Sequence, residues 1–193
     1  MEVIELGAAW ATPQGEVIDT LQRFVRPTER PTLTPFCIEL THIQQAQIDT
    51  APSWPTVAAE LAEFARLHAG RCWGSWGKYD ARPIERETAR HGLADPLAGL
   101  PHVNLKASFA KGRRIKQVGM ATALQIAGLE LEGEHHRALS DARNIARLLP
   151  WCLSQPSVEG WLHRQVGPAF DALKDDPSRA LTPEQVRRGL KHD

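Results

Sequence analysis

Apolar positions in the first 150 residues follow two periods, one typical of strands and one typical of helices. Residues 3–10 and 16–26 are rich in strand-forming residues and flank the turn sequence TPQG, so they predict a β-hairpin. Residues 51–70 show helical spacing between Ser/Pro start signals and Gly70, which predicts an amphipathic helix. Short strands are expected near 71–77 and 101–104, and helices near 79–91, 119–127 and 136–153. This alternation after a hairpin predicts an α/β layered domain.

Other segments lack a clear period. The proline-punctuated residues 26–35 are expected to form a loop. The composition of LTPFCIELTHI, residues 33–43, indicates a loop with a short apolar segment. Residues 155–193 are predicted to form a C-terminal helical extension, which separates them from a main domain of residues 1–154.

The composition indicates which kinds of binding partner and which cellular compartment are expected for this protein. The 193 residues include 23 basic and 23 acidic side chains, so an anionic partner would have to be met by a local patch. Cys37, Cys72 and Cys152 are odd in number and lack C-x-x-C spacing, which favours a reducing, cytoplasmic setting. No apolar run is long enough to cross a membrane, and MEVIELGAAW does not resemble a secretory leader. We therefore predict a cytoplasmic protein without a membrane partner.

The stretch GEHHRALSDARNIARLL, residues 133–149, raises a question of chemistry. Four apolar residues recur at helical spacing and predict a buried stripe: Ala138, Ala142, Ile145 and Leu149. Asp141 lies at the edge of this stripe, where desolvating a carboxylate is costly without a cation or a metal. His136 precedes it by five positions, about 140° around an ideal helix. The two can share a site only if His136 lies on the loop that leads into the helix.

Two interpretations of these residues are open. A histidine that titrates near neutrality can deprotonate a water molecule, and a neighbouring carboxylate can hold a divalent cation. Alternatively, His135 and His136 are solvated at a polar helix entry, and Asp141 pairs with Arg137 or another base. Asp80 follows a predicted strand, where α/β sheets place functional groups, but an aspartate stabilised by a helix dipole fits the same position.

A basic cluster occurs in KGRRIKQ, residues 111–117, which is predicted to be a loop. Its cationic side chains could hold phosphate groups, and the alternative is a solvated surface loop. The residues concerned are Lys111, Arg113, Arg114 and Lys116.

Six stretches, in chain order, resemble the DEDDh 3′–5′ exonucleases: EVIELGA, LTPFCIELTHI, WGSWGKYD, NLKASFA, VGMATAL and GEHHRALSDARNIARLL. The similarity is greatest to the histone-mRNA 3′-exonuclease-like group, which includes the sporulation-inhibitor type of bacteria. This resemblance implies an RNase H-like fold with a mixed five-stranded sheet flanked by helices. It also implies a site with two Mg²⁺ or Mn²⁺ ions that releases nucleoside monophosphates from single-stranded RNA or DNA 3′ ends.

The resemblance also implies roles for individual residues. His136 matches the general base, and Asp80 and Asp141 match metal-site aspartates. The loop that abuts the terminal nucleotide is matched by Leu40, Thr41 and Ile43, and His42 stands where glycine is common in the family.

The first motif of the family, D-x-E on the strand before EVIELG, has no counterpart in this sequence. An exonuclease domain without this central strand is expected to bind metal weakly and to have impaired activity. The natural protein could be longer and active, or the strand could come from the same chain, a second copy in a homodimer or a strand-donating partner. A third explanation is a degenerate exonuclease, acting as a non-catalytic nucleic-acid-binding or regulatory module. The presence of Asp80, His136 and Asp141 favours the first explanation over the third.

Overall fold

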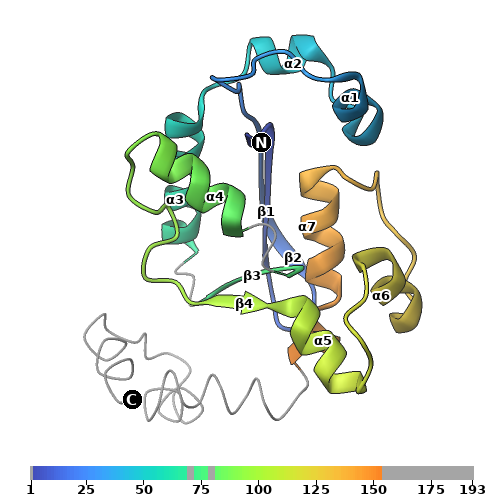
Figure 1. Cartoon of the computed structure of the whole chain (residues 1–193). Helices are drawn as coiled ribbons and strands as arrows, with labels where there is room; N and C mark the ends of the chain where they lie inside the picture. The colour runs from blue at the N-terminus through green and yellow to red at the C-terminus, as the bar shows by residue number, and fades with distance from the viewer. Residues whose placement is uncertain (1, 69–71, 78–80, 154–193) are drawn as a thin grey trace. The chain divides into compact units, whose positions relative to one another are not determined.

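The computed structural model describes residues 2–68, 72–77 and 81–153 (Figure 1). Asp80 and the predicted helices of residues 155–193 lie outside the described residues. The described strands are β1 (Glu5–Ala11), β2 (Val17–Phe24), β3 (Trp73–Ser75) and β4 (His102–Asn104). The described helices are α1 (Pro35–Thr41), α2 (Gln45–Asp49), α3 (Trp54–Leu67), α4 (Ala81–Arg90), α5 (Leu105–Arg113), α6 (Met120–Ala127), α7 (Ala138–Arg147) and α8 (Leu149–Leu153). Met1–Cys152 form one compact unit, and the domain boundary at residue 154 stays a prediction.

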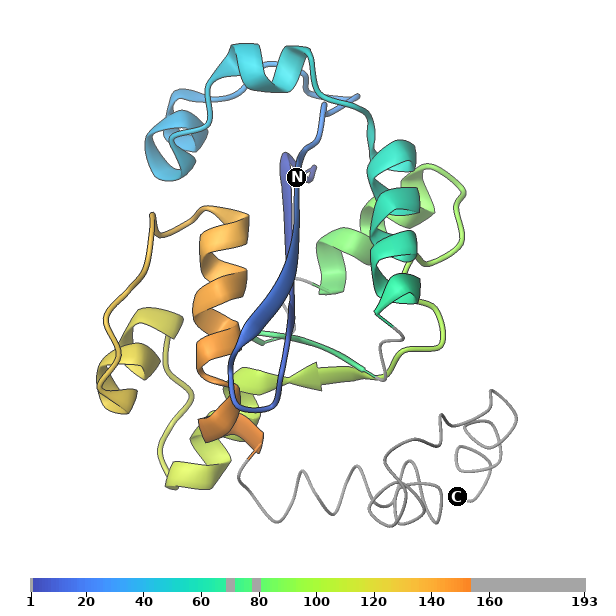
Figure 2. The ribbon, with the colours of Figure 1, turned by 180° about the vertical axis from the view of Figure 1, so that it is seen from behind.

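The predicted hairpin is confirmed and forms the centre of the layered arrangement. Strands β1 and β2 pair antiparallel, with Glu5 opposite Phe24 and a bulge between Trp10 and Ala11. Because side chains alternate along a strand, Leu6 enters a core with α3 while Glu5 faces α7. Helices α3 and α4 lie on one side of the hairpin and α7 lies on the other, as both views show (Figures 1 and 2).

The four described strands form two separate two-stranded sheets rather than one continuous sheet. The second sheet pairs β3 and β4 in parallel, with Trp73 opposite His102 and Ser75 opposite Asn104. Strand directions are therefore mixed, as the family resemblance implies. The strand that this resemblance places between the two sheets is not among the described strands.

Each part of the described structure has its own buried apolar cluster. The hairpin packs on α3 through a cluster that includes Leu21, Trp54 and Val57. A second cluster joins helices α5, α6 and α8 around Phe109 and Leu124. A third holds α1 and α2 together through Leu33, Ile43 and Ile48.

Two segments predicted to be loops are helical. Residues 33–43 contain α1, because Pro35 occupies the first turn and the Thr34 side chain accepts a hydrogen bond from the Cys37 N–H at 3.2 Å. Part of the basic segment belongs to α5, whose start is capped by Asn104 accepting from the Ala107 N–H at 2.9 Å. The sequence contained both capping signals; the expectation of a loop was wrong for residues 35–41 and 111–113 and is confirmed for residues 114–117.

The long helix predicted over 136–153 is also corrected. Helix α7 begins at Ala138 and ends at Arg147, and α8 follows from Leu149. Pro150 has no N–H to donate, so the hydrogen-bond ladder cannot run unbroken through this point.

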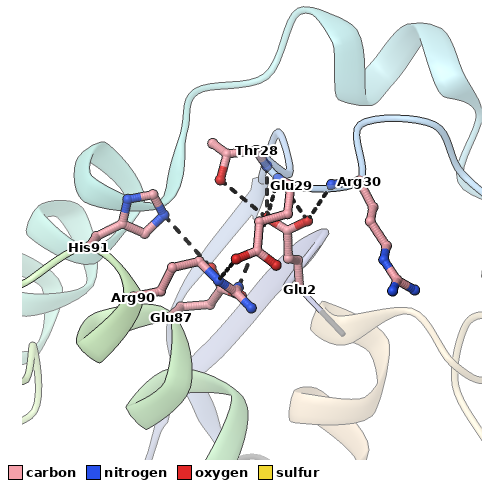
Figure 3. A network of polar contacts seen from close by, with 7 residues as sticks. All are labelled: Glu2, Thr28, Glu29, Arg30, Glu87, Arg90 and His91. Atoms are coloured by element: carbon pink, nitrogen blue, oxygen red, sulfur yellow. Dashed lines mark hydrogen bonds and ion pairs between the residues drawn. The ribbon is translucent and has the colours of Figure 1, made fainter.

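A polar network ties the start of the chain to the loop after β2 and to α4 (Figure 3). The buried carboxylate of Glu2 accepts hydrogen bonds from the backbone N–H groups of Thr28 at 2.7 Å and Arg30 at 2.8 Å, and from Glu29 at 3.2 Å. Arg90 of α4 lies 3.9 Å from the same carboxylate and also pairs with Glu29. Burial raises the pKa of Glu2, but these backbone donors outweigh it and the net pKa is lowered from 4.5.

Replacing Glu2 by glutamine is expected to lower the free energy of unfolding at pH 7 by about 1–2 kcal/mol, because charge-assisted hydrogen bonds are lost. Since the folded-state pKa of Glu2 is depressed, its contribution is present above pH 4.5 and is lost as the pH falls through the folded-state value. Urea denaturation of both proteins from pH 7 to pH 3 should therefore show a difference that shrinks below pH 4.5. Glu16→Gln, at an exposed position, is the matched control; an equal effect from it would refute the assignment.

Candidate active site

His136 lies on the turn that leads into α7, as its predicted role requires. Helix α7 begins two residues later, at Ala138, and His136 has a left-handed φ of 65°. Its side chain is exposed, and its ring centroid lies 4.0 Å from that of His135. The imidazole is therefore accessible to water at the start of the helix.

Asp141 lies in the first turn of α7, where a negative charge interacts favourably with the helix dipole. Its backbone N–H donates to the Arg137 carbonyl at 2.9 Å, so the helix is regular at this position. The predicted buried stripe is corrected: Ala138, Ala142, Ile145 and Leu149 are only half-buried. The buried residues of α7 are Asn144 and Ala146, because the helix packs against β1 on one side and α6 on another.

The loop before His136 is held to α7 by the side chain of Asn144, which is completely buried. Its Nδ2 donates to the carbonyls of Glu132 and Ser140, each at 2.8 Å. Its Oδ1 accepts from the Glu132 N–H at 3.1 Å and from Arg147 Nη1 at 3.0 Å. The Asn144 side chain therefore bonds both the N–H and the carbonyl of Glu132 and holds this residue to α7.

The segment after His136 is held to the hairpin by Glu5. The Glu5 carboxylate accepts from the Ala138 N–H at 2.9 Å and pairs with Arg137 at 3.1 Å. The bond to Glu5, opposed by partial burial, raises the pKa of the Arg137 guanidinium. Arg137 also lies 3.6 Å from Glu134, so among the described residues its ion pairs are with these two glutamates.

The predicted nucleotide-contacting residues lie at the end of α1, which the structure brings beside the histidine loop. His42 Nδ1 lies 3.9 Å from a carboxylate oxygen of Glu134, and His42 has a left-handed φ of 57°. Leu40 is 39% exposed, and the Thr41 hydroxyl donates to the Cys37 carbonyl at 2.7 Å. Ile43 is only 1% exposed, so its side chain belongs to the core beneath this segment and is not available to a nucleotide.

The basic cluster lies away from the histidine loop. The guanidinium of Arg113 lies 4.2 Å from the Phe109 ring centroid and donates to the Trp151 carbonyl at 3.1 Å. Trp151 is in α8, beyond the C-terminal end of α7, and α7 is about 15 Å long. Lys111 and Arg114 are exposed, with Arg114 at the C-cap of α5. The cluster is therefore placed at the end of α7 opposite His136.

The side chains around α7 include the type of ligand that a hard divalent cation prefers, but the described residues offer too few of these ligands. Asp141 contributes carboxylate oxygens, which Mg²⁺ and Mn²⁺ prefer. Within residues 2–68, 72–77 and 81–153, no three histidine, cysteine or acidic side chains form a group able to hold a metal ion. The described residues therefore do not make a metal centre by themselves, and Asp80 is outside them.

Two of the three cysteine thiols lack the properties of a nucleophile. All three cysteines are free, and burial raises the pKa of the Cys152 thiol to about 12, against a smaller opposing effect of Arg113. Burial also raises the pKa of Cys72. A nucleophilic cysteine needs a lowered pKa, so these two residues do not have the chemistry of nucleophiles.

Sequence reasoning did not identify Glu5 or Asn144 as parts of the site. The signal for Glu5 was an acidic residue on the face of β1 opposite Leu6, within EVIELG. The signal for Asn144 was a polar residue beside Ile145 and Ala146, in a helix that also contains Ala138 and Ala142. Neither signal indicated its partner, because both partners are fixed only by tertiary packing.

An α/β domain with a turn histidine followed by a first-turn helix aspartate has the arrangement of an RNase H-like nuclease. The chain belongs to the exonuclease family: the family model described as Exonuclease matches residues 1–149. The 3′–5′ exonuclease eri1 of Schizosaccharomyces pombe is 28% identical over 186 residues, which cover 77% of this chain and 59% of that protein. The chain thus spans less than two thirds of the length of this relative.

Solved structures agree with this assignment. The nuclease domain of 3′hExo, a DEDDh family member bound to rAMP, superposes with a TM-score of 0.74 at 25% identity, over 82% of this chain and 83% of that chain. A 3′-exonuclease in 3′-end specific recognition of histone mRNA stem-loop gives a TM-score of 0.73 at 25% identity, over 82% and 74%. The predicted RNase H-like fold and DEDDh resemblance are confirmed.

Proposed function

We propose that this protein is a divalent-metal-dependent 3′–5′ exonuclease that acts on single-stranded RNA ends. The observation that carries the proposal is the position of His136, exposed on the turn before α7, with Asp141 in the first turn of that helix. The DEDDh family to which the fold belongs is metal-dependent, and its relatives are named as 3′–5′ exonucleases and exoribonucleases. RNA is favoured over DNA because related structures hold rAMP or a histone mRNA stem-loop.

In the proposed reaction, His136 takes a proton from a water molecule as the water oxygen attacks the terminal phosphodiester phosphorus. The new P–O bond forms while the bond to the preceding 3′ oxygen breaks; that oxygen takes a proton from solvent and becomes the new 3′-hydroxyl of the shortened strand, and a nucleoside 5′-monophosphate is released. Proton transfer by a positioned histidine contributes roughly 10²–10⁴-fold to such reactions. When bound, two divalent ions would stabilise the attacking and leaving oxygens. Asp80 and Asp141 are the residues we propose to hold them.

The substrate end is proposed to lie between the start of α7 and the end of α1. Leu40 and Thr41 are the proposed contacts with the terminal nucleotide, and the buried Ile43 supports them from below. Lys111 and Arg114 are proposed to contact phosphates further along the strand, since they lie toward the other end of α7. Arg113 is held by Phe109 and Trp151 and contributes less to such contacts.

The family carboxylates of the D-x-E motif are proposed to complete the site, supplied by this protein in its natural form, by a second copy or by a strand-donating partner. The intact mass of the protein from its natural source, compared with 21.4 kDa, tests the first of these directly. If the mass matches and the protein sediments as a monomer, none of these three sources supplies the D-x-E carboxylates.

Hydrolysis of an RNA oligonucleotide labelled at its 5′ end is the direct test of the proposed function. We expect a ladder of products shortened from the 3′ end and release of nucleoside 5′-monophosphates. We expect EDTA to stop the reaction and excess Mg²⁺ or Mn²⁺ to restore it. A DNA oligonucleotide of the same sequence measures the preference for RNA. Binding of RNA that weakens with salt, without cleavage at any metal concentration, would instead establish a non-catalytic binding module.

The protein is proposed to act in the cytoplasm. Within the described residues, every helix is too short or too polar to traverse a lipid bilayer. The free cysteines accord with a reducing compartment.

A further inference from the structure

We infer that Glu5 is a positioning residue for the reaction, which fixes His136 and the first turn of α7 against the hairpin. This inference rests on the proposed exonuclease function. Glu5 belongs to β1, and no sequence pattern assigns it a role in the chemistry. Its carboxylate nevertheless contacts the two residues that immediately follow His136.

The Glu5 carboxylate is almost fully shielded from solvent, and each of its oxygens accepts two hydrogen bonds. Its side chain is 4% exposed. Oε1 accepts from Gln22 Nε2 at 2.6 Å and from Arg137 Nη2 at 3.1 Å. Oε2 accepts from the Ala138 N–H at 2.9 Å and from Arg137 Nε at 3.2 Å. Two donors from Arg137 make the pair bidentate, which fixes direction as well as distance.

These contacts join three elements at one point. Gln22 comes from β2, Glu5 from β1, and Arg137 and Ala138 from the start of α7. Ala138 is the first residue of α7, and its N-cap, Arg137, makes no side-chain capping bond of its own. Glu5 therefore supplies the acceptor that a local capping side chain supplies in many helices.

The hairpin also limits how α7 can move. A Cβ atom at Gly7 would lie 2.2 Å from the Ala138 carbonyl carbon, so strand and helix backbones are in direct contact at this point. The Arg137 guanidinium lies 5.6 Å from the ring centroid of Phe24, which is the strand partner of Glu5. Sliding or tilting of the first turn is thus opposed both by the backbone contact at Gly7 and by the ion pair at Glu5.

His136 depends on this contact because of its backbone conformation. Its φ of 65° is a conformation that side-chain-bearing residues adopt only when the surroundings hold them there. Asn144 anchors the chain before it through Glu132, and Glu5 anchors the chain after it through Arg137 and Ala138. When the anchor at Glu5 is lost, the backbone of His136 can relax from its left-handed conformation, while the core around α3 stays folded.

The test compares steady-state RNA hydrolysis by wild type and Glu5→Gln, below the melting temperature of both proteins. Glutamine keeps an acceptor for one N–H but turns a donor toward Arg137. We expect kcat to fall by about 10- to 100-fold, as for small misplacements of catalytic groups, with KM changed less than about threefold. Glu5→Asp keeps the charge but is one methylene shorter, and is expected to behave like Glu5→Gln.

Two controls separate positioning from general stability. Val57→Ala creates a cavity in the buried face of α3 and should lower Tm without changing kcat. Glu63→Gln removes an exposed carboxylate that pairs with Arg66 and should change neither value. If Glu5→Gln loses no more kcat than Val57→Ala at equal destabilisation, or raises KM alone, Glu5 has only a structural role and the inference is wrong.

A second variant and a second readout keep the test independent of folding and of activity. Should Glu5→Gln not fold, Arg137→Lys removes the bidentate pair while the bond from the Ala138 N–H to Glu5 remains, and kcat should fall in the same direction. Amide hydrogen exchange at Ala138, with the ¹H–¹³C ring resonances of His136, reports the geometry directly. If wild type cleaves no RNA, the proposed function fails, whereas unchanged exchange and ring resonances in Glu5→Gln would overturn the positioning role itself.

Discussion

Replacing His136 by alanine is expected to lower kcat for RNA hydrolysis by at least about 10²-fold, because the water nucleophile loses its proton acceptor. The side chain is exposed and is not part of the buried apolar clusters, so Tm should stay within about 1–2 °C of wild type. Single-turnover cleavage of a labelled oligonucleotide and a thermal melt on the same preparation measure the two quantities.

The adjacent histidine provides a matched control. His135 is also exposed, and its ring centroid is 4.0 Å from that of His136. His135→Ala removes an imidazole from the same turn and should retain kcat within a few-fold of wild type. Equal losses in the two variants, or full activity in His136→Ala, would show that the base is another group.

Replacing Asn144 by alanine is expected to lower the free energy of unfolding by about 2–4 kcal/mol, since the Glu132 N–H and carbonyl lose buried partners. For a chain of this size the corresponding fall in Tm is roughly 5–15 °C. Calorimetry or chemical denaturation measures it. Exchange of the Glu132 amide should also accelerate, because its acceptor is gone.

Arg143, the exposed neighbour of Asn144, is the control position. Arg143→Ala changes the same helix at a solvated site and should alter stability by less than about 0.5 kcal/mol. If Asn144→Ala is as mild as Arg143→Ala, water must replace the lost amide contacts, and Asn144 does not anchor the loop.

Local signals predicted most of the described elements. The hairpin, α3, the short strands and α6 follow from period, turn residues and end signals that lie within each segment. Errors arose where composition was weighed above capping: Thr34 and Pro35 begin α1, and Asn104 begins α5. The break between α7 and α8 was missed because the apolar period continues through Pro150 although the N–H ladder cannot.

In the candidate site, too, local signals predicted some features, whereas those that depend on tertiary packing could not be predicted. The spacing of five residues predicted that His136 and Asp141 could share a site only with His136 on the preceding turn, and His136 does lie there, although the helix was predicted to begin at His136 and begins at Ala138. The roles of Glu5 and Asn144 could not be predicted, because their partners depend on how strand and helix pack. The basic cluster could not be located relative to His136 for the same reason, as only the packing of α5 on α8 sets its position.

The contact between Glu5 and Ala138 joins residues separated by 133 positions in the chain. By contrast, β1 and β2 close through a turn of a few residues and α3 follows soon after, so these elements form from local contacts. Closing so long a loop costs entropy that the first turn of α7 cannot offset alone. Docking of α7 is therefore expected late in folding, and the chain acquires a defined His136 only at that step. Partly folded molecules would contain a native-like hairpin and no active site.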